Sequence, residues 1–350
     1  MITKNKKIKT LVCILGQTRA QDITWKNFNK YLLKSLNADL ALCIAEKRTT
    51  NNNMYKKAKF IWNYKDLRDY TKYFSDAQNY LLKRKKIKKK PSWKKLIRIK
   101  HFWLARLKGA TKIRNNKGIY SSGTGALLIY NRWFLLQKIM KHRLYKKYDR
   151  IIITRSDFVW SIHHPKMENL DPNYIWIPNG EKYGGYTDRH AVLSRDNFYD
   201  YLNLLEPILL EPDKLYNLMK SKKNWNLERY IKFYLEQKGY SNKVKLFPYI
   251  MFSVRNKKIK TTFRPGTYSF KHKFFIKYFK EYLSSIIFFN LIGDKNKNYK
   301  NFTLLNLFYR IFKNLFKIKI ILNFYLNKPK NIKTFDKKFI LENLEKKIII

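Results

Sequence analysis

"IIITRSDFVW", residues 151–160, is the stretch on which the fold is decided. Three isoleucines and a threonine form a β-branched run, which is typical of a buried strand. The run ends at Arg155, Ser156 and Asp157 before the chain turns apolar again. The pattern predicts a core strand that carries one cation and one carboxylate to its tip. These charges either form part of a ligand site or lie where a strand meets solvent.

Strands and a helix alternate at the start of the chain. Residues 10–15 form an apolar run that ends at Gly16, and residues 24–37 repeat apolar side chains at helical spacing. Two further apolar runs, 38–46 and 59–64, are typical of strands. Strand, helix and strand with short connections predict a parallel pair joined by a right-handed crossover. Such an opening is typical of a nucleotide-binding α/β half-domain.

The rest of the α/β pattern extends to residue 255. A basic helical segment, residues 77–148, precedes the strand at 151–155 and ends in a long amphipathic helix. The strands and helices expected after it are 174–180, 190–194, 195–210, 226–239 and 244–255. We expect residues 1–255 to form one α/β domain, a mainly parallel sheet flanked by helices, with the 10–15 strand near the 151–155 strand.

The net charge of +52 is the most extreme property of the 350 residues, of which 45% are hydrophobic. Lys, Asn, Ile, Tyr and Phe are abundant together, as an AT-rich genome would produce; the alternative is a functional basic surface that meets phosphates or anionic lipid. Residues 77–148 contain no Asp or Glu, whereas residues 149–255 contain 13 acids against 16 Lys and Arg. Carboxylates are thus retained in the middle of the chain, where we expect the catalytic segment.

The cysteines and the N-terminus indicate a compartment. Cys13 and Cys43 lie in apolar runs, so we expect buried thiols in a reducing compartment and no disulfide framework. The N-terminus has a basic start, but its apolar run of five or six residues is too short for a signal peptide or a spanning helix. These features predict a cytoplasmic protein.

Polar residues gather in two segments after the 151–155 strand. "GGYTDRHAVLS" offers Gly184, Gly185 and Asp188, and glycines allow the backbone to approach a ligand closely. Glu228 lies near the start of the expected 226–239 helix, where a carboxylate either caps the helix or faces a cleft. A lone strand-end aspartate is most often a cap or turn residue. The two neighbouring polar segments strengthen the interpretation of Asp157 as part of a ligand site.

Three histidines invite a metal interpretation. His163 and His164 are adjacent, and neighbouring residues on a strand point to opposite faces. We therefore expect ordinary surface histidines at these two positions. His190, at the entry to a strand, is expected to be structural.

Four motifs in order, "ILGQTR", "YDRIIITRSD", "GGYTDRHAVLS" and "NLERYIKFYLEQKG", resemble bacterial glycosyltransferases of lipopolysaccharide and capsule assembly. The resemblance covers roughly residues 8–255. It implies a GT-A-like, Rossmann-like α/β fold and a nucleotide-sugar donor. It also implies a glycan or lipid-linked acceptor and, usually, Mn²⁺ or Mg²⁺.

The resemblance also implies roles for single residues. Asp157 would be the metal ligand, and Asp188 or Glu228 would orient or deprotonate the acceptor hydroxyl. The nucleotide-sugar would contact Gln17, Thr18, Arg19, Arg155, Gly184 and Gly185. Arg155 stands where the usual Asp-x-Asp pattern has its first aspartate. This departure puts metal dependence in question, because an arginine can itself neutralise phosphate charge.

Residues 256–350 differ in composition from the preceding segment. They contain 5 acids against 22 Lys and Arg, and many aromatic residues at helical intervals. We expect a basic helical extension that either packs on the core or lies on an anionic membrane surface, giving a peripheral membrane protein. Deletion from about residue 270 is expected to leave nucleotide binding intact. Two other classes stay open: a nucleic-acid-binding protein, which the scarcity of Arg and of known modules makes less favoured, and a membrane-surface scaffold without catalysis.

Overall fold

A computed structural model of the chain describes residues 7–45, 52–67, 69–99, 125–180, 182–222, 225–256, 266–269, 272–293 and 299–327. Predictions that fall on residues 100–124 of the basic segment, or on 328–350 of the tail, lie outside the described residues.

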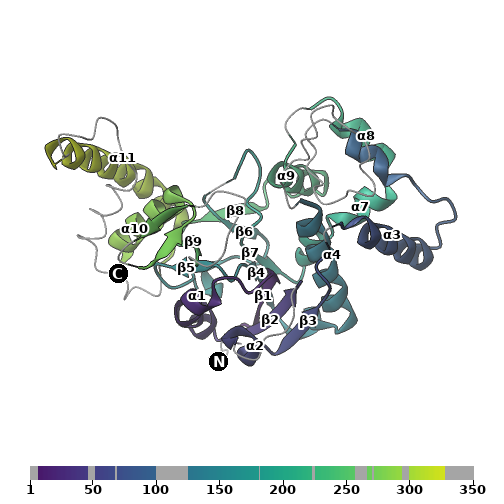
Figure 1. Cartoon of the computed structure of the whole chain (residues 1–350), viewed down its shortest axis with the longest axis horizontal. Coiled ribbons are helices and arrows are strands. Elements are labelled where there is room, and N and C mark those ends of the chain that lie inside the picture. The colour runs from purple at the N-terminus through teal and green to yellow at the C-terminus, as the bar shows by residue number, and fades with distance from the viewer. Residues whose placement is uncertain are drawn as a thin grey trace, which may run out of the picture.

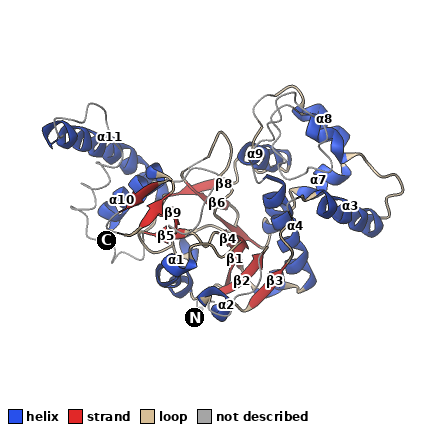
Figure 2. Cartoon of the chain, in the orientation of Figure 1, coloured by secondary structure: helices blue, strands red, loops and turns tan. Residues whose placement is uncertain are grey.

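Seven strands form the main sheet, in the order β3-β2-β1-β4-β7-β6-β8 (Figure 2). The strands β3, β2, β1 and β4 run parallel, β7 is antiparallel to both β4 and β6, and β6 and β8 are parallel. The bounds are β1 (Thr10–Gly16), β2 (Asp39–Ile44), β3 (Phe60–Asn63), β4 (Arg150–Thr154), β6 (Ile175–Pro178), β7 (Ala191–Ser194) and β8 (Val244–Phe247). The predicted mainly parallel sheet is confirmed, and β1 pairs directly with β4.

Both faces of this sheet are buried, which explains why its strands are continuous apolar runs. Along β1, Leu11 and Cys13 lie in one hydrophobic core, and Val12 and Ile14 lie in the other. Cys43 is buried in the first core as well, and both cysteines are free thiols, as predicted.

Helices cover the sheet on its two faces. The first core includes residues of α3 (Thr71–Lys85), α4 (Gly125–Lys141), α5 (Leu144–Lys147), α6 (Phe198–Leu202), α7 (Leu205–Leu210), α8 (Pro212–Met219) and α9 (Leu227–Gln237). The second includes residues of α1 (Gln21–Phe28), its π-helical continuation (Asn29–Lys34), α2 (Asn53–Lys57), α10 (Phe279–Ile292) and α11 (Phe302–Asn327). Figure 1 shows α3, α7, α8 and α9 gathered at one end of the molecule and α10 and α11 at the other.

A second, antiparallel sheet has the order β10-β11-β9-β5. Its strands are β5 (Phe158–Trp160), β9 (Met251–Arg255), β10 (Thr267–Ser269) and β11 (Phe274–Ile276). The chain thus leaves the main sheet at Thr154, passes through the Arg-Ser-Asp turn and enters the second sheet. The predicted helical extension after residue 255 is wrong for β10 and β11, because strands of three residues leave no periodicity that distinguishes them from helix. Residue 255, the predicted end of the α/β domain, is the last residue of β9 and so belongs to this second sheet.

Over residues 302–315, whose side chains the structure describes, helix α11 packs against the rest of the molecule along one side. Its Tyr309 ring stacks on Phe288 of α10, with centroids 4.8 Å apart, and its Asn306 accepts a hydrogen bond from Asn179 at 3.2 Å. On another side of α11, apolar side chains are 40–56% exposed. They are Leu304, Leu307, Phe308, Ile311, Phe312 and Leu315. The helix extends away from the body of the molecule in Figure 1.

Candidate active site at the edge of the main sheet

The order of the parallel strands marks one position for a ligand. From β1 the chain proceeds to β2 and β3 on one side, while β4 lies on the other side of β1. In open α/β sheets, ligands bind beyond the carboxyl ends of the strands at such a switch point. Here those ends are Gly16 of β1 and Thr154 of β4.

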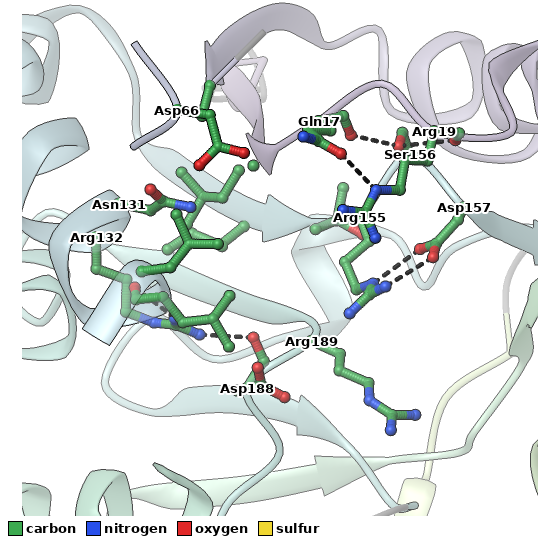
Figure 3. Close-up of a pocket in the computed structure, with 17 residues that line it drawn as sticks. Gln17, Arg19, Asp66, Asn131, Arg132, Arg155, Ser156, Asp157, Asp188 and Arg189 are labelled. Atoms are coloured by element: carbon green, nitrogen blue, oxygen red, sulfur yellow. Dashed lines mark hydrogen bonds and ion pairs between the residues drawn. The ribbon is translucent and has the colours of Figure 1, made fainter. Parts of the chain in front are cut away.

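A pocket opens at these two strand ends (Figure 3). Five of the residues proposed from the sequence line it, namely Gln17, Arg19, Arg155, Asp157 and Asp188. The other lining residues include Asp66, Asn131, Arg132, Ser156 and Arg189. The pocket wall is therefore rich in guanidinium and carboxylate groups from distant parts of the chain.

Ser156 joins the two loops at the switch point. Its hydroxyl oxygen lies 2.8 Å from the carbonyl oxygen of Gln17 and 3.0 Å from that of Arg19. Gly16 precedes this loop with φ at +102°, a conformation that favours glycine. Thr18 is buried and accepts a hydrogen bond from Asn52 at 2.6 Å, so it is held away from the pocket lining.

Arg155 and Asp157 form a two-pronged ion pair at one corner of the pocket (Figure 3). Arg155 donates from Nε to one carboxylate oxygen at 2.8 Å and from a terminal nitrogen to the other at 2.6 Å. The Asp157 side chain is 5% exposed and that of Arg155 is 28% exposed. Burial by itself would raise the pKa of Asp157, but the Arg155 charge outweighs it and lowers the pKa to about 2. The carboxylate is therefore charged at any working pH.

Two more basic side chains reach this corner from the second sheet. Arg255 ends β9, and Lys277 follows β11; both lower the pKa of Asp157. The backbone fixes their positions: Val254 N–H donates to the Asp157 carbonyl at 2.8 Å, and Lys277 N–H donates to the Ser253 carbonyl at 2.9 Å. Burial and the charges of Arg155 and Arg255 lower the pKa of Lys277 to about 6. The corner thus carries more positive than negative charge.

A loop with close backbone packing carries Asp188. A Cβ at Gly185 would lie 1.9 Å from the carbonyl oxygen of Glu228, and Gly184 adopts φ +84°. The structure places neither glycine among the pocket-lining residues. Their lack of side chains instead lets the loop pack against the first turn of α9, where Tyr186 N–H donates to the Glu228 carbonyl at 3.0 Å.

Glu228 lies in the first turn of α9, behind the pocket lining. The cap of this helix is Asn226, whose side chain accepts a hydrogen bond from Arg229 N–H at 2.8 Å. Of the two roles that the sequence allowed for Glu228, helix cap or cleft residue, the cap belongs to Asn226 instead. Burial, followed by the charge of Asp188, raises the pKa of Glu228 to about 7. A carboxyl that changes charge near neutral pH suits a general base.

Several residues of the site escaped the sequence interpretation. Arg132 of α4 is 1% exposed and donates to the Asp188 carbonyl at 2.6 Å, which fixes the loop. Its neighbour Asn131 is fully buried. A polar pair within the apolar "LLIYNRWFLL" was the available signal. Asp66, after β3, follows a strand end in the same way as Asp157.

The histidines differ from the sequence prediction. His163 is 7% exposed and His164 is fully buried, so the expectation of surface histidines at these positions is wrong. The segment after β5 is covered by other parts of the fold; the Tyr31 ring lies 4.8 Å from that of His163. The Nε2 atoms of His164 and His190 lie 3.2 Å apart, and burial lowers the pKa of His164 to about 4. The pair is neutral at neutral pH.

Asp157 was the predicted ligand for a divalent cation. Both of its carboxylate oxygens accept hydrogen bonds from Arg155, and the basic side chains of Arg255 and Lys277 also act on it. Within the described part of the chain, no three His, Cys, Asp or Glu side chains are grouped so that they could hold a metal ion. The described residues at this corner do not fit a divalent cation; the metal role of Asp157 stays a prediction.

No protein-family model matches the sequence, and no curated protein is significantly similar to it. Three solved structures resemble the fold. Mouse xyloside xylosyltransferase 1 in its apo form is 11% identical over 69% of this chain and 85% of its own, with a TM-score of 0.36. The second is a protein of Desulfovibrio desulfuricans G20 that is assigned as a nucleotide-diphospho-sugar transferase. It is 10% identical over 69% of this chain and 79% of its own, with a TM-score of 0.30.

The third is core-mannan synthase A of Aspergillus fumigatus in its Mn/GDP form, which is 8% identical over 72% of this chain and 75% of its own, with a TM-score of 0.36. At these TM-scores the likenesses carry no argument about activity.

None of the helices in the described ranges combines the length and apolar character that a membrane crossing requires.

Proposed function

We propose that the chain is a glycosyltransferase that transfers a sugar from a nucleotide-sugar donor to a glycan or lipid-linked acceptor. One observation carries the proposal: a pocket at the switch point of a parallel sheet has an arginine-rich corner on one side and Asp188 on the other, and the charge of Asp188 raises the pKa of Glu228, which lies outside the lining. The first suits a diphosphate, and the second suits a proton acceptor.

Each side of the pocket then has a part in the reaction. The donor diphosphate lies at the ends of β1 and β4, against Arg19 and Arg155. The acceptor hydroxyl lies on the side of Asp188, which orients it, and its proton passes by way of Asp188 to Glu228, whose pKa the Asp188 charge raises. The new bond forms between the acceptor oxygen and the anomeric carbon of the sugar. The bond between that carbon and the phosphate oxygen breaks, and its electron pair leaves with the nucleoside diphosphate.

A ligand screen tests this proposal. Thermal unfolding of the whole chain is followed with UDP-, GDP-, CMP- and dTDP-sugars, each with and without Mn²⁺. A donor at 100 times its dissociation constant stabilises the fold by about 2.7 kcal/mol. Stabilisation by one donor, followed by release of its free nucleotide when acceptor is added, supports the proposal. If no nucleotide or nucleotide-sugar changes the unfolding temperature, the proposal fails.

The exposed face of α11 supports an acceptor at a membrane surface, as in surface polysaccharide synthesis. Its exposed residues recur every three or four positions, from Leu304 to Leu315, and the helix sequence holds Arg310 and Lys313 but no acid. A helix with an apolar face and basic side chains lies in the interface of an anionic membrane. These features support the proposal of a peripheral protein on the cytoplasmic face of the membrane.

Vesicle binding tests the role of α11. Replacing Leu307 and Ile311 together by Gln is expected to weaken sedimentation with phosphatidylglycerol vesicles at least tenfold, because both side chains would be buried in lipid. Leu218→Gln on α8, a side chain that is 40% exposed elsewhere, is the control. Equal binding of the double variant and the control would exclude this face as the membrane contact.

A further inference from the structure

The corner around Asp157 has the charge pattern of an anion site. Metal sites for Mg²⁺ and Mn²⁺ present carboxylate and carbonyl oxygens to the ion. Here the guanidinium of Arg155 lies on both oxygens of Asp157, in the fork geometry that arginine also uses for phosphate. A dication placed on Asp157 would have to displace Arg155 first.

Arg255 and Lys277 make this displacement less favourable still. Neither forms an ion pair with a carboxylate of the described residues, and both act on Asp157 and Arg155 electrostatically. Arg255 is 7% exposed, and its buried Nε has no hydrogen-bond partner among the described residues. A buried donor of this kind costs free energy unless a ligand or water satisfies it. The corner therefore disfavours a second cation and suits an anion.

We propose, on the basis of the function proposed above, that Arg155, Arg255 and Lys277 neutralise the donor diphosphate in place of a divalent cation. Asp157 positions the guanidinium of Arg155, and the second sheet delivers the other two cations. When the bond between sugar and phosphate breaks, the electron pair that stays on the diphosphate is stabilised by these side chains. Transfer by this chain then proceeds with its own cations and depends strongly on ionic strength.

Calorimetry with inorganic pyrophosphate tests the anion site directly. The full chain is titrated in EDTA, and the titration is repeated at higher salt. We expect binding in EDTA and a loss of affinity as salt rises. The pKa of Lys277 is lowered to about 6 in the free chain, and a bound anion favours its protonated form. Lys277→Met is therefore expected to weaken binding on the order of tenfold or more, because it removes one charge-assisted contact. Lys280→Met, an exposed lysine three residues further on, is the matched control and is expected to change affinity less than twofold.

Arg155→Gln is the second variant, but it leaves the buried Asp157 unpaired and so lowers stability. Within the described part of the chain Lys277 has no ion-pair partner that its replacement would leave buried and unpaired, which keeps the test independent of folding. Donor binding in the presence of EDTA, found in the same screen of nucleotide-sugars, supports the inference. Donor binding that appears only with Mn²⁺ or Mg²⁺ overturns it and leaves the glycosyltransferase proposal intact. Absence of both donor and pyrophosphate binding, with or without metal, overturns both.

Discussion

Asp157 and Glu228 mark two regions of the site that treat a carboxylate in opposite ways. Burial raises the pKa of each group. For Asp157 the cation of Arg155 then lowers it to about 2, whereas for Glu228 the anion of Asp188 raises it further, to about 7. The partner, more than the burial, decides which carboxyl stays charged. Groups whose environments separate their pKa values in this way divide the work of charge and proton between them.

The largest effect is expected from Glu228→Gln, which removes the proton acceptor and keeps the shape. The turnover number should fall by roughly 10²–10⁴-fold, the usual contribution of a general base, while pyrophosphate affinity stays the same. Glu236→Gln, at the far end of the same helix, is the control, because Glu236 only pairs with Lys232 on the surface. If both variants turn over at the wild-type rate, Glu228 is not the proton acceptor.

Asp157→Asn should act on the fold as well as on the reaction. Removing one partner of a buried ion pair leaves Arg155 unpaired, so we expect the free energy of unfolding to fall by roughly 3 kcal/mol, the low end for such pairs, because Arg155 keeps some contact with water. Sugar transfer should be lost with it. Asp213→Asn breaks the exposed pair with Lys95 and should cost less than about 1 kcal/mol. Urea unfolding of both variants decides, and equal midpoints would contradict the buried-pair assignment.

The pH dependence of transfer should follow Glu228. The base works when deprotonated, so kcat/KM should be constant above pH 7 and fall about tenfold per unit below it. Asp157, with a pKa of about 2, stays charged throughout. Lys277, with a pKa of about 6, changes charge in the same range and affects donor binding, so kcat at saturating donor is measured beside kcat/KM to isolate Glu228. A rate that is level between pH 8 and pH 5 would remove Glu228 from the role of base.

The smallest effect near neutral pH concerns the buried pair of His164 and His190. Their pKa values are lowered in the folded chain, so the unfolded chain binds more protons and stability rises with pH. The contribution of the pair to the free energy of unfolding should be fully present above about pH 6.5 and should be lost progressively as pH falls toward 4. Urea midpoints between pH 8 and pH 5 measure this, and a His164→Asn variant with the same slope would exclude the pair as the cause.

The parallel half of the fold could be predicted because its strands are continuous apolar runs, and a strand end is where Arg19, Asp157 and their neighbours meet. The sequence could not show that Lys277 lies near Asp157, because pairing of β5 with β9 and of β9 with β11 leaves no local signal. A deletion from residue 270, which the sequence suggested as harmless to nucleotide binding, would remove Lys277. It would also remove Glu281, the buried partner of Arg189.

The role of Asn131 and Arg132 was hidden for a different reason. Both lie on a helix whose other residues are mostly apolar, and helical periodicity reports which face is buried without saying what it is buried against. The helix turns these two polar side chains toward the carboxyl edge of the sheet, where Arg132 holds the Asp188 loop (Figure 3).

The dependence of the pocket on its second sheet has a consequence for synthesis. A nascent chain that has emerged through β7 already contains the four parallel strands and both loops of the switch point. It lacks β9 and β11, and therefore Arg255 and Lys277. Under the proposed function, a fragment that ends after β7 lacks part of the anion site and binds nucleotide-sugar more weakly than a chain that extends through Lys277.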